Sequence, residues 1–372
     1  MKEQSYGLVK PTNFKTDKPI QMVSGDILNQ YELVYETYGK LNKTKNNAIL
    51  VCHALNASHH AAGYYESGTK KNYGWWDNLI GPNKPVDTNK FFVISINNLG
   101  GCHGSTGPKS INPLTKKPYG STFPFVTVED WVEVQSRLAD HLEIEKFYAV
   151  IGGSLGGMQA LEWTIAKPNR VENALIIAAT SKLSAQNIAF NQVARQAITS
   201  DPNFHKGDYY EKKVIPYDGL RVARMLGHIT YQSDFVMMKK FGRQLMETSD
   251  SKFNTNINFQ IESYLEYQAD KFAKSFDANT YLRITKALDN YDPASRFQNG
   301  LLEALSNKKN RFLIVSFTSD WRFAPSHSLE IVNALIHNKS DVSYVEIDAP
   351  EGHDAFLLEN ENYHRTIRSF LK

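Results

Sequence analysis

A serine, an aspartate and a histidine occur in this chain in the order found in one large group of enzymes that use a serine nucleophile. Ser154 lies in the segment GGSLG (152–156), between an apolar run that predicts a strand and a run that predicts a helix. A sharp strand-to-helix turn exposes the serine hydroxyl, and flanking glycines avoid collision with the neighbouring backbone. Asp320 and His353 each follow a later apolar run. Because a serine hydroxyl needs a base and an orienting acid, the three residues predict a Ser–His–Asp triad.

This chemistry also needs donors for the negative charge that develops on the substrate's carbonyl oxygen. We expect one from the backbone amide of Leu155, because the helix predicted over 158–166 follows directly after the serine turn and its dipole favours an anion. We assign the second to the amide of Leu55, which lies beside Asn56 at the end of the first core strand. The simpler alternative is that GGSLG is a turn that only binds phosphate. The presence of Asp320 and His353 favours catalysis.

Six short apolar runs predict the strands that must position these residues. The runs span 47–55, 91–97, 147–152, 174–180, 311–318 and 342–347. Between them lie helical patterns such as 128–142, where Trp131, Val134 and Leu138 recur at spacings of three and four. The alternation predicts a mostly parallel sheet with helices on both faces. Functional residues then gather beyond the carboxyl ends of the strands.

The region 183–307 interrupts this alternation. It has no convincing strand, is rich in helix formers, and contains turns at Asp201-Pro202 and Asp292-Pro293. We therefore expect an inserted helical lid at 183–307 on a core domain made of 1–182 and 308–372, as one composite fold.

Composition excludes several classes of protein. Apolar residues make up 41% of the 372 residues, too many for a disordered chain. The net charge of +3 gives no reason to expect a nucleic-acid or membrane-surface partner. No apolar run approaches the roughly 20 residues that cross a bilayer. The two cysteines, Cys52 and Cys102, form no disulfide framework and no secretion signal is apparent, so we expect a cytoplasmic protein.

Two further groups suggest other chemistry. His59 and His60 are adjacent, but no cluster of acids or cysteines completes a metal site, so we expect no metal and a solvated or loop-packing role. Cys102 lies beside His103, but adjacent residues usually point apart. We expect an unreactive, buried cysteine.

Five longer motifs extend the pattern beyond the triad. They are HAL at 53–55, NNLGGCHGSTGP at 97–108, GSLGGMQ at 153–159, ARMLGHITY at 223–231 and GHD at 352–354. Together they closely resemble the homoserine O-acyltransferases of the α/β-hydrolase superfamily over nearly the whole chain. The resemblance implies the α/β-hydrolase fold and transfer of an acyl group from coenzyme A to L-homoserine, in methionine biosynthesis, by a cytoplasmic homodimer. Acyl-CoA is then a co-substrate, and no cofactor is permanently bound.

The resemblance also implies substrate contacts. Homoserine is a zwitterion, so its pocket needs a cation and an anion. Carried over by motif, Arg224 pairs with the carboxylate and Asp354 receives the ammonium, while Tyr231 and Asn56 line the pocket. Without the motif, Arg224 would be interpreted as a solvated charge and Asp354 as a loop cap.

The choice of acyl donor depends on the segment TSDWRFAP (318–325). Relatives that transfer acetyl generally carry an apolar residue, often leucine, where this chain has Arg322. A succinyl group ends in a carboxylate, which is costly to bury unless a guanidinium meets it. We therefore expect succinyl-CoA. Acetyl-CoA as donor, an esterase or thioesterase that uses water, and a binding protein without catalysis remain as alternatives.

Overall fold

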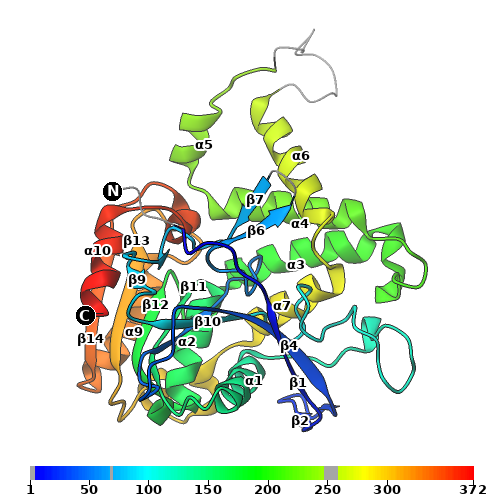
Figure 1. Ribbon diagram of the computed structural model, residues 1–372. Coiled ribbons are helices and arrows are strands. Elements are labelled where there is room, and N and C mark those ends of the chain that lie inside the picture. The colour runs from blue at the N-terminus through cyan, green and yellow to red at the C-terminus, as the bar shows by residue number, and fades with distance from the viewer. Residues whose placement is uncertain (1–4, 68–69, 247–258) are drawn as a thin grey trace.

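The computed structural model describes residues 5–67, 70–246 and 259–372, and within them one large sheet forms the centre of the molecule (Figure 1). Its eight strands lie in the order β1-β4-β10-β5-β11-β12-β13-β14. From β10 to β14 all neighbours are parallel, whereas β4 pairs antiparallel with both β1 and β10. The strands span Thr12–Thr16 (β1), Tyr31–Tyr38 (β4), Ala48–Cys52 (β5), Phe92–Ile96 (β10), Phe147–Gly153 (β11), Val171–Ile177 (β12), Arg311–Phe317 (β13) and Asp341–Ile347 (β14).

Each face of the sheet buries its own apolar core, as alternation of side chains along a strand requires. Val150 of β11 packs into one core with helices α1 (Val128–His141), α2 (Leu155–Ala166) and α9 (Pro325–His337). Its neighbour Ile151 packs into the other core, which includes α10 (Glu361–Phe370) and the loop around Trp76. This arrangement confirms the predicted fold class.

Helices fill the described part of the chain between β12 and β13. They are α3 (Ala185–Ser200), α4 (Tyr217–Tyr231), α5 (Asp234–Lys240), α6 (Gln260–Ala273), α7 (Ala278–Asn290) and α8 (Gly300–Ala304). Ser184 and Asp277 begin α3 and α7 as N-caps, each side chain accepting a hydrogen bond from a backbone amide of the first turn. In Figure 1, α3 and α4 cross above the sheet, and α5 and α6 project from the top. No helix in the described ranges is long and apolar enough to span a membrane.

Short elements complete the described fold. Three two-stranded pairs join β2 (Ile20–Gln21) to β3 (Ile27–Leu28), β6 (Tyr64–Ser67) to β7 (Lys70–Tyr73) and β8 (Ile80–Gly81) to β9 (Val86–Asp87). Five 3₁₀ turns span Gly120–Thr122 (η1), Pro168–Arg170 (η2), Pro202–Gly207 (η3), Pro293–Arg296 (η4) and Gly352–Leu357 (η5).

All six predicted strands are present, but some bounds were wrong. The strand predicted at 174–180 is Val171–Ile177, because Ala178 turns out of the ladder with a φ of 46°. The strand predicted at 47–55 ends at Cys52, where the chain enters a turn. The helix after the serine already begins at Leu155. The antiparallel strands β1 and β4 were not predicted.

Candidate active site

Ser154 lies at a sharp turn between the end of β11 and the start of α2. Its backbone has φ 58° and ψ −124°, a conformation that a non-glycine residue adopts only under strain. A Cβ on Gly152 would lie 2.2 Å from the carbonyl carbon of Gly156, and one on Gly156 would lie 2.0 Å from the carbonyl oxygen of Cys52. Both positions therefore require glycine, and the turn presents the serine hydroxyl above the sheet.

The structure brings Ser154, His353 and Asp320 into one hydrogen-bonded chain. His353 Nε2 lies 2.8 Å from Ser154 Oγ, and His353 Nδ1 lies 2.7 Å from Asp320 Oδ2. Because the carboxylate accepts at Nδ1, Nε2 is free to accept the serine proton. The other carboxylate oxygen, Oδ1, accepts the backbone amides of Arg322 and Phe323. The arrangement can activate a hydroxyl as a nucleophile.

Loops beyond two neighbouring strands hold the acid and the base. Asp320 follows β13, and His353 lies in η5, shortly after β14. Gly352 before it has a φ of 74°, and a Cβ there would lie 2.7 Å from the carbonyl oxygen of Tyr231. The imidazole stacks on the Phe323 ring with centroids 4.7 Å apart and 21° between the planes. Packing therefore fixes the plane of the base as well as its position.

The two amides assigned to the oxyanion come from the serine turn and from the loop after β5. Leu155 is the first residue of α2, and Leu55 lines the same cavity as Ser154. Neither the Leu55 amide nor the Leu155 amide donates a hydrogen bond to a backbone carbonyl in the turns, loops and caps of the described residues. Free amides at this edge suit a developing oxyanion.

A cavity of about 240 Å³ opens at Ser154 and is lined by loops and turns beyond the strands and by residues of α3, α4 and α7. It brings together most of the predicted residues: Leu55, Asn56, Ser154, Arg224, Tyr231, Arg322, His353 and Asp354. Sequence reasoning missed other lining residues, among them Trp75, Leu183, Asn191, Leu288, Phe323 and Phe356. These are ordinary apolar or amide side chains from scattered segments, and no local motif marks them.

Two charges on the cavity wall have no ion-pair partner among the described residues. The Arg224 guanidinium lies 5.2 Å from the Phe272 ring centroid, and its buried Nε has no hydrogen-bond partner. Desolvation raises the pKa of Asp354, while His353 and Arg224 oppose the rise. One cation and one anion facing the same space suit a zwitterionic ligand.

Arg322 places a third charge at the cavity and is only 8% exposed. Its Nη1 donates to Thr230 Oγ1 at 2.6 Å and its Nη2 to Asn191 Oδ1 at 3.3 Å. The guanidinium carbon lies 4.9 Å from the centroid of the Tyr231 ring. Both acceptors are neutral, and no described carboxylate forms an ion pair with it, so the positive charge remains uncompensated.

The remaining candidates do not join this site. His59 and His60 are not solvated but lie in a buried polar cluster with Glu36 and Tyr65. Burial raises the pKa of Cys102 to about 12, so its thiolate is scarce at neutral pH. Among the described residues, no group of three acids, histidines or cysteines is placed to hold a metal ion.

Known proteins match this chain along nearly its whole length. A family model described as the alpha/beta hydrolase fold matches residues 47–360. Homoserine O-succinyltransferase from Paraburkholderia phymatum is 58% identical over 371 residues, which cover 99% of this chain and 97% of that protein. The crystal structure of homoserine O-acetyltransferase from Bacillus anthracis superposes with a TM-score of 0.91 at 29% identity, covering 98% of each chain. The crystal structure of esterase E22 superposes with a TM-score of 0.87 at 30% identity, covering 98% of this chain and 100% of the esterase. The fold, the geometry of the serine turn and these matches together show that the chain belongs to the homoserine O-acyltransferase family of the α/β-hydrolase superfamily.

Proposed function

We propose that this protein is a homoserine O-succinyltransferase, which moves a succinyl group from succinyl-CoA to the hydroxyl of L-homoserine in methionine biosynthesis. The observation that carries the choice of donor is the buried guanidinium of Arg322, which faces the cavity of Ser154 without a carboxylate partner. A succinyl carboxylate would supply the missing negative charge, whereas an acetyl group would leave the guanidinium uncompensated.

The first half-reaction acylates the enzyme. Ser154 Oγ gives its proton to His353 Nε2 and attacks the thioester carbon, while Asp320 stabilises the imidazolium. The Leu55 and Leu155 amides stabilise the oxyanion. The carbon–sulfur bond then breaks, coenzyme A leaves as the thiol with the proton from His353, and a succinyl-serine ester remains.

The second half-reaction transfers the acyl group. Arg224 binds the carboxylate of homoserine and Asp354 its ammonium, so that the hydroxyl points at the ester carbon beside Asn56 and Tyr231. His353 accepts the hydroxyl proton, the new ester forms, and Ser154 recovers its proton as it leaves. Release of coenzyme A before homoserine reacts makes the kinetics ping-pong.

Hydrolysis is the second candidate function, and the likeness to esterase E22 favours it. The same triad with water as the second nucleophile would make an esterase or a thioesterase. The opposite charges of Arg224 and Asp354 on the cavity wall support the transferase, because water as a nucleophile needs neither.

Thiol release distinguishes these functions. The protein is incubated with succinyl-CoA or acetyl-CoA, each with and without homoserine, and free coenzyme A is followed with a thiol reagent. We expect turnover only when homoserine is present, and faster turnover with succinyl-CoA. Thiol release that does not depend on homoserine would identify a hydrolase, and preference for acetyl-CoA would identify the acetyltransferase.

Ser154→Ala should abolish turnover while leaving the melting temperature close to that of the wild type.

Residues 183–307 serve in this proposal as a lid on the core domain of 1–182 and 308–372. The cavity supports that division, since Arg224 and Tyr231 come from the lid, and Ser154 and His353 come from the core. The lid excludes water from the acyl-serine while admitting the amino alcohol.

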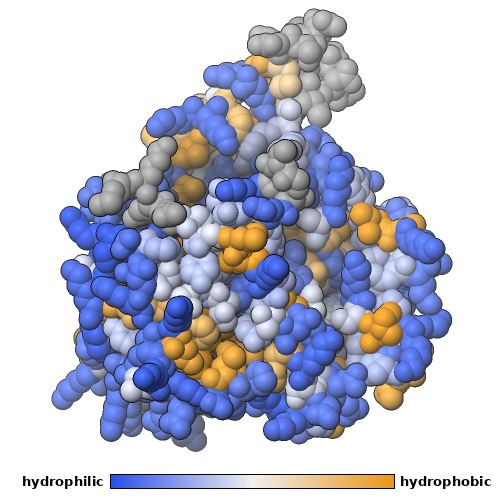
Figure 2. Space-filling model, viewed as in Figure 1, coloured by the Kyte–Doolittle hydropathy of each residue, from blue (hydrophilic) through white to orange (hydrophobic). Residues whose placement is uncertain are grey.

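The proposal includes a homodimer formed through the lid. Large apolar side chains are exposed on α4, α5 and α6, among them Ile229, Phe235, Met238 and Tyr267, and Figure 2 shows apolar surface over α5. Such patches mark interfaces more often than free surface. Sedimentation should give a dimer for the wild type and a monomer for Phe235→Glu with Met238→Lys; a monomeric wild type would contradict the dimer.

We place the enzyme in the cytoplasm as part of the same proposal. The two unpaired cysteines, Cys52 and Cys102, support a reducing compartment.

A further inference from the structure

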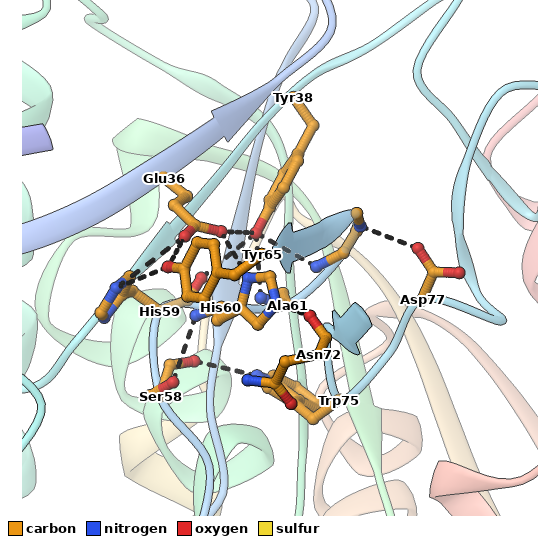
Figure 3. Close-up of polar contacts among 12 residues, drawn as sticks. Glu36, Tyr38, Ser58, His59, His60, Ala61, Tyr65, Asn72, Trp75 and Asp77 are labelled. Carbon is orange, nitrogen blue, oxygen red and sulfur yellow. Dashed lines mark hydrogen bonds and ion pairs between the residues drawn. The ribbon is translucent and has the colours of Figure 1, made fainter. Parts of the chain in front are cut away.

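A buried carboxylate lies next to the loop 53–62, which carries Leu55, and takes no part in the proposed reaction. Glu36, on β4, is fully buried. Its oxygens accept hydrogen bonds from Tyr38 Oη at 2.5 Å, from Tyr65 Oη, and from His60 Nδ1 at 3.1 Å (Figure 3). No described lysine or arginine forms an ion pair with it. A buried carboxylate requires a compensating charge, and His60 is the group in position to supply it.

The contacts of His60 require both ring nitrogens to donate. Nδ1 faces the Glu36 carboxylate, and Nε2 lies 2.9 Å from the carbonyl oxygen of Asn72 on β7. Neither partner has a proton to give, so only the imidazolium satisfies both. Desolvation lowers the pKa of His60, but hydrogen bonds to Glu36 and Asn72 and the charges of Glu36 and Asp77 outweigh it and raise the pKa above its ordinary value. The ring also stacks on Tyr65, with centroids 3.9 Å apart.

His59 completes the cluster as a neutral group. Burial lowers its pKa to about 4, although the Glu36 charge opposes the shift. Its Nε2 lies 3.3 Å from Tyr65 Oη, which already gives its proton to Glu36, so His59 donates there. The cluster therefore holds one carboxylate and one imidazolium, in charge balance.

This cluster holds one end of the loop that carries Leu55. Tyr38 Oη accepts the backbone amides of Ala61 and Ala62, at 2.9 and 3.1 Å. The carbonyl of His60 accepts the amide of Trp75, whose indole lines the active-site cavity.

The other end of the loop is held at His53. Its Nε2 accepts the amide of Asn98, and its carbonyl accepts the side chain of Gln159. Within the loop, backbone hydrogen bonds run from the Ala57 amide to the Ala54 carbonyl and from the Ala61 amide to the His59 carbonyl, and Trp75 Nε1 donates to the Ser58 carbonyl at 2.9 Å. The position of the Leu55 amide therefore depends on both anchors.

We infer that Glu36 is a positioning residue for acylation: with His60 as imidazolium and with Tyr38, it fixes the loop 53–62 so that the Leu55 amide meets the oxyanion. The inference rests on the proposed acyl-serine chemistry. Glu36 acts through the loop and touches no substrate, so its loss should lower the rate of acylation more than the binding of homoserine.

Glu36→Gln tests the inference, because glutamine keeps the size and removes the charge. Acylation of Ser154 is measured with p-nitrophenyl acetate, which needs neither coenzyme A nor homoserine. We expect the acylation rate to fall at least tenfold at pH 7, and the KM for homoserine in the complete reaction to stay within twofold. Glu36→Asp, which restores the charge, should recover part of the rate.

The matched control is Glu32→Gln on the same strand. The Glu32 carboxylate pairs with the exposed Lys15 and lies outside the cluster, so the acylation rate of this variant should match that of the wild type.

The pH profile separates positioning from general destabilisation. In the wild type, the imidazolium of His60 persists below its raised pKa and is lost as the pH rises through that value. Glu36→Gln removes the charge and the charge-assisted bond that raise this pKa but leaves the desolvation that lowers it. The alkaline fall in acylation should therefore move to lower pH in Glu36→Gln and stay in place in Glu32→Gln.

The outcomes are distinguishable from failure of the proposed function. If Glu36→Gln melts like the wild type and acylates at the wild-type rate with an unshifted profile, the inference is wrong. If Glu36→Gln does not fold, Tyr65→Phe replaces it, since it removes a single neutral donor and keeps the carboxylate charge; we expect at least a threefold fall in the acylation rate without the alkaline shift, and a wild-type rate would overturn the inference. A wild type that is acylated by the ester but transfers nothing to homoserine would contradict the proposed function and leave this test intact.

Discussion

At the scale of single residues, the site is defined by which charges already have a partner and which do not. Asp320 is satisfied on both oxygens, by His353 and by two backbone amides. Arg224, Asp354 and Arg322 face the cavity without an ion-pair partner among the described residues. Charges that the fold leaves unpaired are sites for complementary charges on substrates.

Asp320→Asn should nearly abolish catalysis without unfolding the protein. The asparagine carbonyl can still accept the amides of Arg322 and Phe323, but its NH₂ group then faces His353 Nδ1 and forces the proton onto Nε2, the atom that must accept from Ser154. We expect kcat to fall by about 10⁴-fold. Asp348→Asn is the control, because Asp348 lies exposed at the same sheet edge. A steady-state rate for Asp320→Asn within tenfold of the wild type would contradict the role given to Asp320.

Arg322→Leu should shift the choice of donor from succinyl-CoA toward acetyl-CoA. Leucine removes the charge that meets the succinyl carboxylate and leaves an apolar wall that suits a methyl group. A hydrogen bond to a charged group contributes about 1.5–3 kcal/mol, so the ratio of kcat/KM for the two donors should fall by about tenfold or more. Arg311→Leu, an exposed arginine on β13, is the control. An unchanged ratio in Arg322→Leu would refute this role.

At the scale of elements, the triad could be placed from sequence because each residue follows a strand whose apolar pattern is local. Ser154, Asp320 and His353 therefore fell at one sheet edge without knowledge of the packing. The cluster around Glu36 could not be found in this way, since β4 joins the sheet through antiparallel pairing, and the partners Tyr65 and His60 come from a separate hairpin and loop. Trp75 and Asn191 were missed for the same reason: tertiary packing alone brings them to the cavity.

The serine turn gives a prediction at this scale. Gly156→Ala would place a Cβ 2.0 Å from the Cys52 carbonyl oxygen, where only backbone could move. We expect a loss of more than about 3 kcal/mol in unfolding free energy, together with loss of acylation. Gly25→Ala separates this clash from conformational strain, because Gly25 has a φ of 93° but nothing within 4 Å of its Cβ position. Urea unfolding of both variants provides the measurement, and equal losses would show that the close approach is unimportant.

At the scale of the whole molecule, the proposed lid must keep a fixed position relative to the core, because residues of both line the cavity. The polar contacts that couple them include one from α7 and one from η4. Thr280 Oγ1 on α7 donates to the Gly100 carbonyl. Arg296 of η4 donates from both terminal nitrogens to Glu162 of α2, at 2.6 and 2.8 Å, and Glu162 is fully buried. The second contact ties the lid to the same helix that follows Ser154.

Arg296→Leu should destabilise the protein and do so more strongly as the pH rises. Desolvation raises the pKa of Glu162, and Arg296 opposes that rise. Without the arginine, the pKa should rise further, so the carboxyl is protonated at low pH and becomes an uncompensated buried charge only when the pH passes through the raised value. The loss of unfolding free energy should be on the order of 3 kcal/mol at pH 8 and clearly smaller at pH 5.

The double variant Arg296→Leu with Glu162→Leu removes both charges and should lose this pH dependence. Melting temperatures of the three proteins across this range test the argument, and a penalty that does not change with pH would show that the lid is held by apolar packing instead.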